Sequence, residues 1–404
     1  MTCATPAGAG DPNQKLLECG CLESGRNLVV CIDGTANKFD TKAIKSTNVV
    51  QLYSSLVKNE EQLTYYNSGI GTYATPSFKS WSWWKQVIGH KIDLAIAWRF
   101  EKIIIGAYQW LSEEYKDGDR IYLFGFSRGA YQVRALSAMI DKVGLIHKGN
   151  QAQIPFAYEL YASIDESKPH ADSSSVPMEM HFKTTFSRDV RVHFVGAWDT
   201  VSSVGIFQGK DVPFTACGMK HVCCFRHALA LDERRVKFQP EYVSGGLHKV
   251  EERPGKPAEK EARKYSVPHV KEVWFPGSHS DIHIGLPLQW MSREARNAGV
   301  RFRLFGTEGQ ALGLAKFHES LTAAWKLLEY LPIKRRLYND SNSATWWPNR
   351  GNGRQIVPGQ MIHKSVYDDL KYVPLARLPA ALSLGWLHTN SKEELEKGGL
   401  SLED

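Results

Sequence analysis

The sequence predicts an α/β fold in which helices flank a mostly parallel central sheet. Four short runs of mainly apolar, β-branched and aromatic residues have the composition of strands buried on both faces, at residues 27–32, 121–124, 191–196 and 270–275. Between them, residues 91–115 and 130–140 place apolar residues at helical spacing. Strands that alternate with helices in this way form βαβ units, whose strands are parallel.

The run at 121–124 leads into Gly125-Phe126-Ser127-Arg128-Gly129, and a predicted helix follows at once. A strand, a Gly-x-Ser-x-Gly turn and a helix are together typical of a nucleophile elbow, in which a strained turn projects the serine hydroxyl from the sheet edge. Glycines flank the serine because a Cβ there would collide with the neighbouring strand or helix. Ser127 is therefore the candidate nucleophile of an α/β-hydrolase fold. The alternative is a turn in which the serine is only structural.

Two further predicted strands end beside residues that can complete such a site. Asp199 follows the strand at 191–196, and His279 follows 270–275, the last predicted strand. A serine hydroxyl becomes nucleophilic when a histidine removes its proton and a carboxylate orients that histidine. In α/β-hydrolases these groups occur along the chain in the order nucleophile, acid, histidine. The sequence thus predicts a triad of Ser127, Asp199 and His279.

Other residues compete for these roles. His283 lies four residues after His279 and is an alternative base, and Asp281 is an alternative acid whose closeness to His279 favours a role in fixing the loop. Asp232 falls in a predicted helix at 226–235 and is expected to be a salt-bridge partner. The His-x-Asp-x-His spacing also permits a metal site, but no third ligand is evident elsewhere in the sequence. No metal and no cofactor are therefore expected.

The first predicted strand ends in Asp33-Gly34-Thr35. Ligands of open α/β sheets bind at the edge formed by the carboxyl ends of the strands. The backbone N–H of Gly34 or Thr35, together with the N–H of Arg128 after the nucleophile, is therefore predicted to form an oxyanion hole. A turn capped by the aspartate explains the same tripeptide equally well.

Composition and charge describe an ordinary globular protein. Hydrophobic residues make up 43% and charged residues 23% of the 404 residues, and the net charge of +7 is spread along the chain rather than clustered, so no nucleic-acid partner is expected. The seven cysteines lack the spacing of a disulfide framework, the first residues lack the features of a secretory signal, and no stretch approaches eighteen apolar residues. These features predict a cytoplasmic location.

The chain is expected to form a flexible tail at 1–24 and a single α/β-hydrolase domain at 25–404. Three segments of that domain are expected to lie outside its core: cap or loop inserts at about 148–188 and 205–265, and a mostly helical C-terminal part at about 286–404.

The most aromatic stretch contains Trp81, Trp83 and Trp84 between lysines. Indole rings favour the boundary between membrane and water, so a peripheral membrane contact is one interpretation. Packing of the three rings on the domain's own core is the other.

At its motifs the chain resembles the α/β-hydrolase family catalogued as domain of unknown function 2235, whose bacterial relatives include type VI secretion phospholipase effectors. The resemblance extends over about residues 26–375 and is similar to the arrangement of fungal members with a single hydrolase domain. The motifs that carry it are Asp33-Gly34-Thr35, Gly69-Ile70-Gly71-Thr72, residues 118–130, Trp198-Asp199-Thr200-Val201, residues 226–233 and residues 274–281.

The resemblance implies a serine-hydrolase site made of Ser127, Asp199 and His279. The chain departs from the family after the His-Ser-Asp motif, where glycines are usual and Ile282-His283-Ile284-Gly285 stands here. The expected function is hydrolysis of a carboxylic ester, of an acyl lipid or phospholipid, through an acyl-enzyme. A catalytically silent binding or scaffold protein is the alternative, and a peptidase or thioesterase is a third interpretation.

Overall fold

The computed structural model describes residues 25–34, 47–69, 91–165, 176–201, 213, 215, 219, 221–243, 270–282, 285–303, 318–338, 344–368, 372–379, 395–396 and 399–404. The predicted tail at 1–24 and the tryptophans Trp81, Trp83 and Trp84 lie outside these residues.

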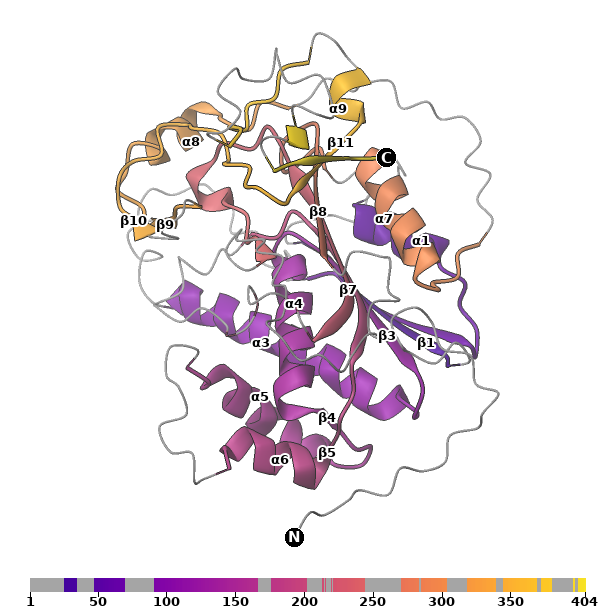
Figure 1. Ribbon diagram of the computed structural model, residues 1–404. Helices are drawn as coiled ribbons and strands as arrows, with labels where there is room; N and C mark the ends of the chain where they lie inside the picture. The colour runs from indigo at the N-terminus through magenta and orange to yellow at the C-terminus, as the bar shows by residue number, and fades with distance from the viewer. Residues whose placement is uncertain are drawn as a thin grey trace, which may run out of the picture.

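An eight-stranded sheet lies at the centre, in the order β12-β11-β8-β7-β6-β3-β1-β2, and all neighbouring strands are parallel. The α/β fold with a mostly parallel sheet is therefore confirmed (Figure 1). The carboxyl ends of parallel strands meet at one edge, which brings together residues that are far apart in sequence. The strands are β1 (Asn27–Ile32), β2 (Gln62–Asn67), β3 (Arg120–Phe126), β6 (Val192–Trp198), β7 (Val222–Ala230), β8 (Val270–Phe275), β11 (Met361–His363) and β12 (Ser401–Glu403).

The sheet buries apolar side chains on both faces. In β1, Leu28, Val30 and Ile32 belong to one apolar cluster, while Val29 and Cys31 belong to a second, as the two-residue period of a strand requires. Helices cover these two faces: α3 (Lys91–Glu114) and α4 (Arg128–Val143) on the first, and α1 (Asn48–Ser55) and α7 (Leu286–Asn297) on the second (Figure 1).

The helix predicted at 226–235 was wrong, because the first half of that segment belongs to the buried strand β7 and the second half is not helical. Its alanine, leucine, glutamate and arginine residues favour helices when local propensity alone is counted. Tertiary pairing decides otherwise: Arg226 bonds to Glu294 of α7, and His227 Nδ1 lies 2.9 Å from Glu272 Oε1 on the neighbouring strand. The region predicted as an insert at about 205–265 therefore contributes a central strand.

The C-terminal part also differs from its prediction. Beyond α7, its described residues form short elements rather than mostly helices, and β8 is not the last strand, because β11 and β12 extend the sheet. Three-residue strands are too short to show a hydrophobic period in the sequence. The remaining short elements of this part are α8 (Ala323–Leu328), β9 (Arg335–Arg336), β10 (Ala344–Thr345) and α9 (Ser365–Asp368).

The segment predicted as a cap at about 148–188 is helical where the structure describes it. It contains η2 (Gln151–Gln153), α5 (Ile154–Ala162) and α6 (Met178–Phe186), and its strand β5 (Ser187–Arg188) pairs with β4 (Leu145–Ile146). Lys183 of α6 donates to the carbonyl of Asp141, close to the C-terminal end of α4. Ser127 precedes the other end of this helix, about 24 Å away at 1.5 Å per residue. The α6 part of the segment therefore lies far from Ser127.

Two features of the described residues bear on the cell biology of the chain. None of their helices combines the length and the apolar character that crossing a membrane requires. Cys31 is buried, and burial raises the pKa of its thiol well above the ordinary value.

Candidate active site

Ser127 occupies the sharp turn between β3 and α4. Its backbone has a φ of 57° and a ψ of −120°, a conformation that costs free energy in any residue other than glycine. The two flanking glycines are required sterically. A Cβ on Gly125 would lie 2.4 Å from the carbonyl oxygen of Gly129, and a Cβ on Gly129 would lie 2.3 Å from that of Ile32. The turn is therefore a strained elbow, as the sequence predicted.

His279 reaches Ser127 from the loop after β8. Its Nε2 lies 3.0 Å from Ser127 Oγ, and its Nδ1 is hydrogen-bonded to Oδ2 of Asp199. The imidazole is held between two aromatic rings: Phe126 stacks on it at a centroid distance of 5.0 Å, and Phe238 meets it edge-on at 4.9 Å. The three residues chosen from the sequence are thus connected by hydrogen bonds, and all three are buried.

Asp199 follows β6 in a second strained turn, with a φ of 43°. Its carboxylate accepts the N–H of Ala230 at 3.1 Å and two hydrogen bonds from Arg354, at 2.5 and 2.9 Å. Burial by itself would raise the pKa of Asp199, but the guanidinium of Arg354 and the hydrogen bond with His279 outweigh it and hold this pKa well below its ordinary value. Asp199 is therefore a fixed negative charge beside the imidazole.

Arg354 is a site residue that sequence reasoning missed. It is fully buried, and its guanidinium also donates to the carbonyl oxygens of Ala230 and Phe238. It lies in a loop before β11, far along the chain from the elbow, and its neighbours Gly351, Asn352 and Gly353 have the composition of any surface turn. Nothing local distinguishes it from the other arginines, and only the tertiary structure reveals its partner.

Glu233 fixes the loop that carries His279 and was also missed. Its carboxylate accepts the backbone N–H groups of Arg234, Arg235 and His279, at 3.0, 2.8 and 3.3 Å, and the guanidinium of Arg235. Burial would raise its pKa, but Arg235 and Arg354 together lower it. A permanent carboxylate therefore holds the start of the histidine loop.

The structure gives a different result for each of the three residues that were predicted to form the oxyanion hole. Arg128 is the first residue of α4, so its N–H has no intrahelical carbonyl to bond and lies at the positive end of the helix dipole. The N–H of Gly34 already donates to Oδ1 of Asp33 at 2.6 Å, which occupies the donor that the prediction needed. Thr35 lies outside the described residues.

The competing residues have other partners. Asp281 accepts from the N–H and hydroxyl of Ser278, at 2.9 and 2.8 Å, and from His318, so it fixes the loop as the sequence suggested. Asp232 is not the helical salt-bridge residue that was predicted, because it follows β7 and accepts hydrogen bonds from neutral donors. His283 lies outside the described residues. Among the residues that are described, no cluster of histidine, cysteine or acidic side chains could hold a metal ion.

Comparison with known proteins places this chain in a family. Residues 26–298, more than half of the chain, match the family described as the catalytic domain of Tle1-like phospholipase effectors of the type VI secretion system (T6SS). The uncharacterized protein YEL023C of Saccharomyces cerevisiae is 37% identical over 226 residues, which are 54% of this chain and 32% of that protein. The chain thus spans about a third of the length of this relative.

Two solved structures resemble the chain more distantly. The Tle1 effector bound to the VgrG spike of the type VI secretion system has 16% identity and a TM-score of 0.35, over 71% of this chain and 57% of that one. An uncharacterized protein from Pseudomonas aeruginosa has 15% identity and a TM-score of 0.33, over 69% and 47%. The match over residues 26–298 decides the assignment, and the chain belongs to the family of Tle1-like phospholipase effector catalytic domains.

Proposed function

We propose that this protein is a serine hydrolase that cleaves the carboxylic ester of an acyl lipid, with Ser127 as nucleophile, His279 as general base and acid, and Asp199 as the acid that orients His279. The observation that carries the proposal is the continuous hydrogen-bonded path from Ser127 Oγ through the imidazole to a carboxylate that stays ionised. This is the arrangement in which an alcohol becomes a nucleophile near neutral pH.

In the first half-reaction, Ser127 Oγ attacks the carbonyl carbon of the ester while His279 Nε2 takes the hydroxyl proton. The imidazolium that forms is stabilised by the negative charge of Asp199. The tetrahedral intermediate expels the alcohol, which receives the proton from His279, and the acyl group remains on Ser127. In the second half-reaction, a water molecule gives its proton to His279 and attacks the acyl-enzyme, which releases the fatty acid and restores the Ser127 hydroxyl.

The oxyanion of each tetrahedral intermediate needs hydrogen-bond donors that are already in place. We assign one of them to the N–H of Arg128, since it lies next to the nucleophile at the start of α4. The second donor is assigned to the loop at residues 33–35. Because Gly34 donates to Asp33, this role requires either the N–H of Thr35 or a turn of Gly34 away from Asp33 when substrate binds.

The family supports a lipid ester as substrate, since the matching description is that of phospholipase effectors. The test is release of fatty acid from phosphatidylcholine and from a short-chain nitrophenyl ester, with Ser127→Ala as the control. We expect release from both by the wild type and none above background with Ser127→Ala. Release of product from the nitrophenyl ester alone would support the hydrolase activity but would contradict phospholipid as the substrate. A folded wild type that cleaves neither would support the binding or scaffold alternative.

A further inference from the structure

An exposed, partly aromatic surface lies close to His279, on the C-terminal part of the chain beyond the family match. Its apolar members are Leu327, Tyr330, Leu331, Trp346 and Trp347, and its exposed basic members are Lys326, Lys334 and Arg350. We call these eight residues the α8 surface. The side chains of Trp347, Leu327, Tyr330 and Trp346 are between 62% and 76% exposed, which is unusual for residues of this size.

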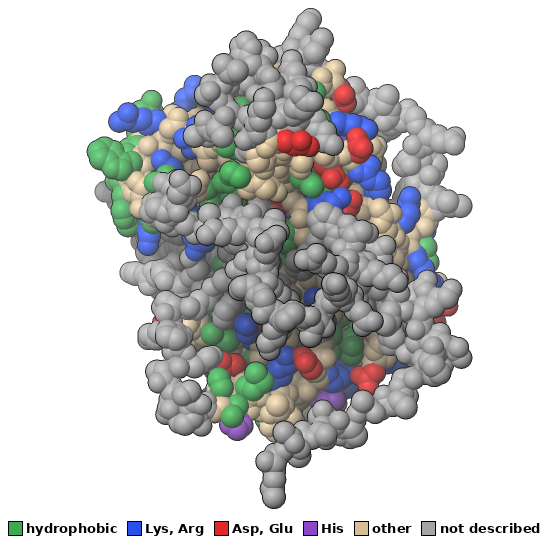
Figure 2. Space-filling model, viewed as in Figure 1, with side chains coloured by type: hydrophobic (Ala, Val, Ile, Leu, Met, Phe, Trp, Pro, Cys, Tyr) green, Lys and Arg blue, Asp and Glu red, His purple; other side chains and the backbone are tan. Residues whose placement is uncertain are grey.

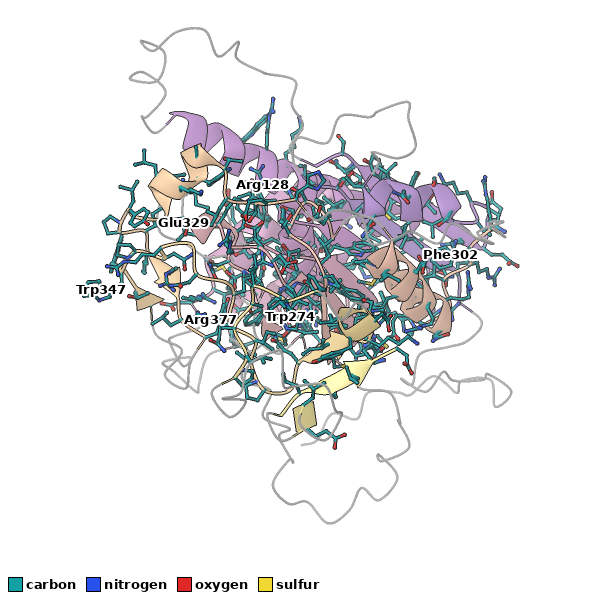
Figure 3. The ribbon with its side chains drawn as sticks, turned by 90° about the horizontal axis from the view of Figure 1, so that it is seen from above. Arg128, Trp274, Phe302, Glu329, Trp347 and Arg377 are labelled. Carbon is teal, nitrogen blue, oxygen red and sulfur yellow. The ribbon has the colours of Figure 1, made fainter. Side chains whose placement is uncertain are left out.

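The members of the α8 surface come from two segments that are bonded to each other. At the end of α8, the carbonyl of Glu329 accepts the N–H of Arg350 at 2.9 Å, and the Glu329 carboxylate accepts Asn349 Nδ2 at 2.7 Å and the N–H of Gly351 at 3.2 Å. These bonds hold the segment after Trp347 against the helix. Seen from above, Glu329 and Trp347 lie on the same side of the molecule, with Trp347 at its outer edge (Figure 3). The apolar side chains therefore form one surface.

The inner side of α8 reaches the candidate site. Trp325 packs on Phe238 at a centroid distance of 5.5 Å, and Phe238 contacts the imidazole of His279. The guanidinium of Arg235 lies 3.6 Å from the Phe238 ring centroid and is bonded to Glu233. Two aromatic rings in series, Trp325 and Phe238, thus connect α8 to the imidazole of His279.

The charges identify the kind of partner. Lys326, Lys334 and Arg350 are exposed, and among the described residues no carboxylate forms an ion pair with any of them. Of the acidic residues near this surface, Glu329 is buried and accepts hydrogen bonds, and Glu319 is paired with Arg234 at 2.7 Å. Figure 2 shows basic side chains interspersed with hydrophobic ones along the edge where α8, β9 and β10 lie. Tryptophan and tyrosine with neighbouring lysine and arginine are the residues that settle at the boundary of an anionic bilayer.

We infer that the α8 surface docks this protein on a bilayer that carries anionic phospholipids. The inference deepens the proposed function, because it names the form in which the lipid ester is met: in a membrane surface rather than as a dissolved molecule. Docking here places the plane of the headgroups beside α8, which two aromatic rings in series connect to His279. The tryptophans and leucines enter the interface, and the basic side chains contact the phosphates.

The test uses the full-length chain with Ser127→Ala, so that binding is measured without hydrolysis. Vesicles of phosphatidylcholine with phosphatidylserine are sedimented and the bound protein is measured, with vesicles of phosphatidylcholine alone for comparison. We expect binding to the anionic vesicles that weakens as salt is raised. Adding Trp346→Ser and Trp347→Ser is expected to lower the partition coefficient by about tenfold or more. Adding Lys326→Glu and Lys334→Glu is expected to lower it on anionic vesicles only.

The matched control removes exposed apolar side chains elsewhere. Met178 and Met180 of α6 are 63% and 48% exposed, at the opposite end of α4, and Met178→Ser with Met180→Ser is expected to leave the partition coefficient unchanged. Thermal unfolding of each variant checks the fold. Equal binding with and without Trp346 and Trp347 would overturn the inference. So would a dimer, seen by analytical ultracentrifugation, that these substitutions convert to a monomer. Because Ser127→Ala is used throughout, failure of docking is distinguishable from failure of the proposed hydrolase activity.

Discussion

Two buried aspartates follow neighbouring strands at the same edge of the sheet, and they differ in the charge of their partners. Asp199, after β6, accepts hydrogen bonds from a guanidinium and an imidazole, and its pKa is lowered. Asp232, after β7, accepts from the N–H groups of Gly277 and Leu375 and the hydroxyl of Tyr372, and burial raises its pKa. Position and burial alone therefore do not make an aspartate a candidate triad acid. A cation beside the carboxylate and an imidazole within reach are also needed.

The largest expected difference between the two aspartates is catalytic. Asp199→Asn removes the charge that stabilises the imidazolium and that fixes the ring orientation, and kcat is expected to fall about 10⁴-fold. Asp232→Asn keeps the size of the side chain and does not touch His279, so we expect kcat to fall less than about tenfold. The measurement is the rate of hydrolysis of a nitrophenyl ester by the two variants side by side. Equal losses would mean that the charge partners do not distinguish the two positions.

The sequence proposed Asp199 as the candidate acid because a strand pattern ends just before it, and the same local logic selected Ser127 and His279 as candidates. The sequence placed Asp232 in a helix, which was wrong. The residues of β7 have good helix propensity, and they form a strand only because they pair with the neighbouring strands. Arg354 could not be found at all. A buried arginine is recognised by its partner, and that partner lies 155 positions away in the chain. The periodicity of apolar residues therefore predicted the sheet edge and the candidate triad. The residues that contact these three side chains could not be predicted, because their contacts are distant in sequence.

Substitution of Arg354 tests whether its positive charge is what distinguishes Asp199 from Asp232. Arg354→Gln leaves Asp199 buried without its counter-charge, and the free energy of unfolding at pH 7 is expected to fall by about 3 kcal/mol. Arg354→Lys keeps the charge but cannot make both hydrogen bonds, so it should recover part of this loss. The measurement is denaturant unfolding of both variants and the wild type. A loss below about 1 kcal/mol in Arg354→Gln would contradict a stabilising ion pair.

The free energy of unfolding of the same variants is expected to depend on pH in different ways. The folded-state pKa of Asp199 lies below the ordinary value of 3.8, so its ionised form stabilises the fold above pH 3.8, and that contribution is lost as the pH falls from 3.8 towards the folded-state pKa. The wild type should lose about 1.4 kcal/mol per pH unit from this group in that range. Without Arg354 the pKa rises, and the loss becomes smaller. The stability difference between wild type and Arg354→Gln should therefore shrink below pH 3.8, and a difference that grows would contradict the assignment.

A smaller effect on kcat/KM is expected at Glu233, which bonds to the backbone of the His279 loop. Glu233→Gln weakens the bonds that hold the backbone of the His279 loop and leaves Arg235 without its carboxylate. A displaced imidazole should lower kcat/KM by about tenfold. The matched control is Glu319→Gln, which removes an exposed ion pair with Arg234, and it should change kcat/KM by less than about twofold. If the two substitutions have the same effect, Glu233 does not position the histidine.

The activation of Ser127 by His279 and Asp199 is tested most directly by covalent labelling. Purified wild type, Ser127→Ala, Asp199→Asn and Asp232→Asn would be treated with a fluorophosphonate at neutral pH, and the modified peptide identified by mass spectrometry. We expect rapid modification of Ser127 in the wild type and in Asp232→Asn, very slow modification in Asp199→Asn, and none in Ser127→Ala. Folded wild type that stays unmodified, or that is modified at another serine, would contradict the account.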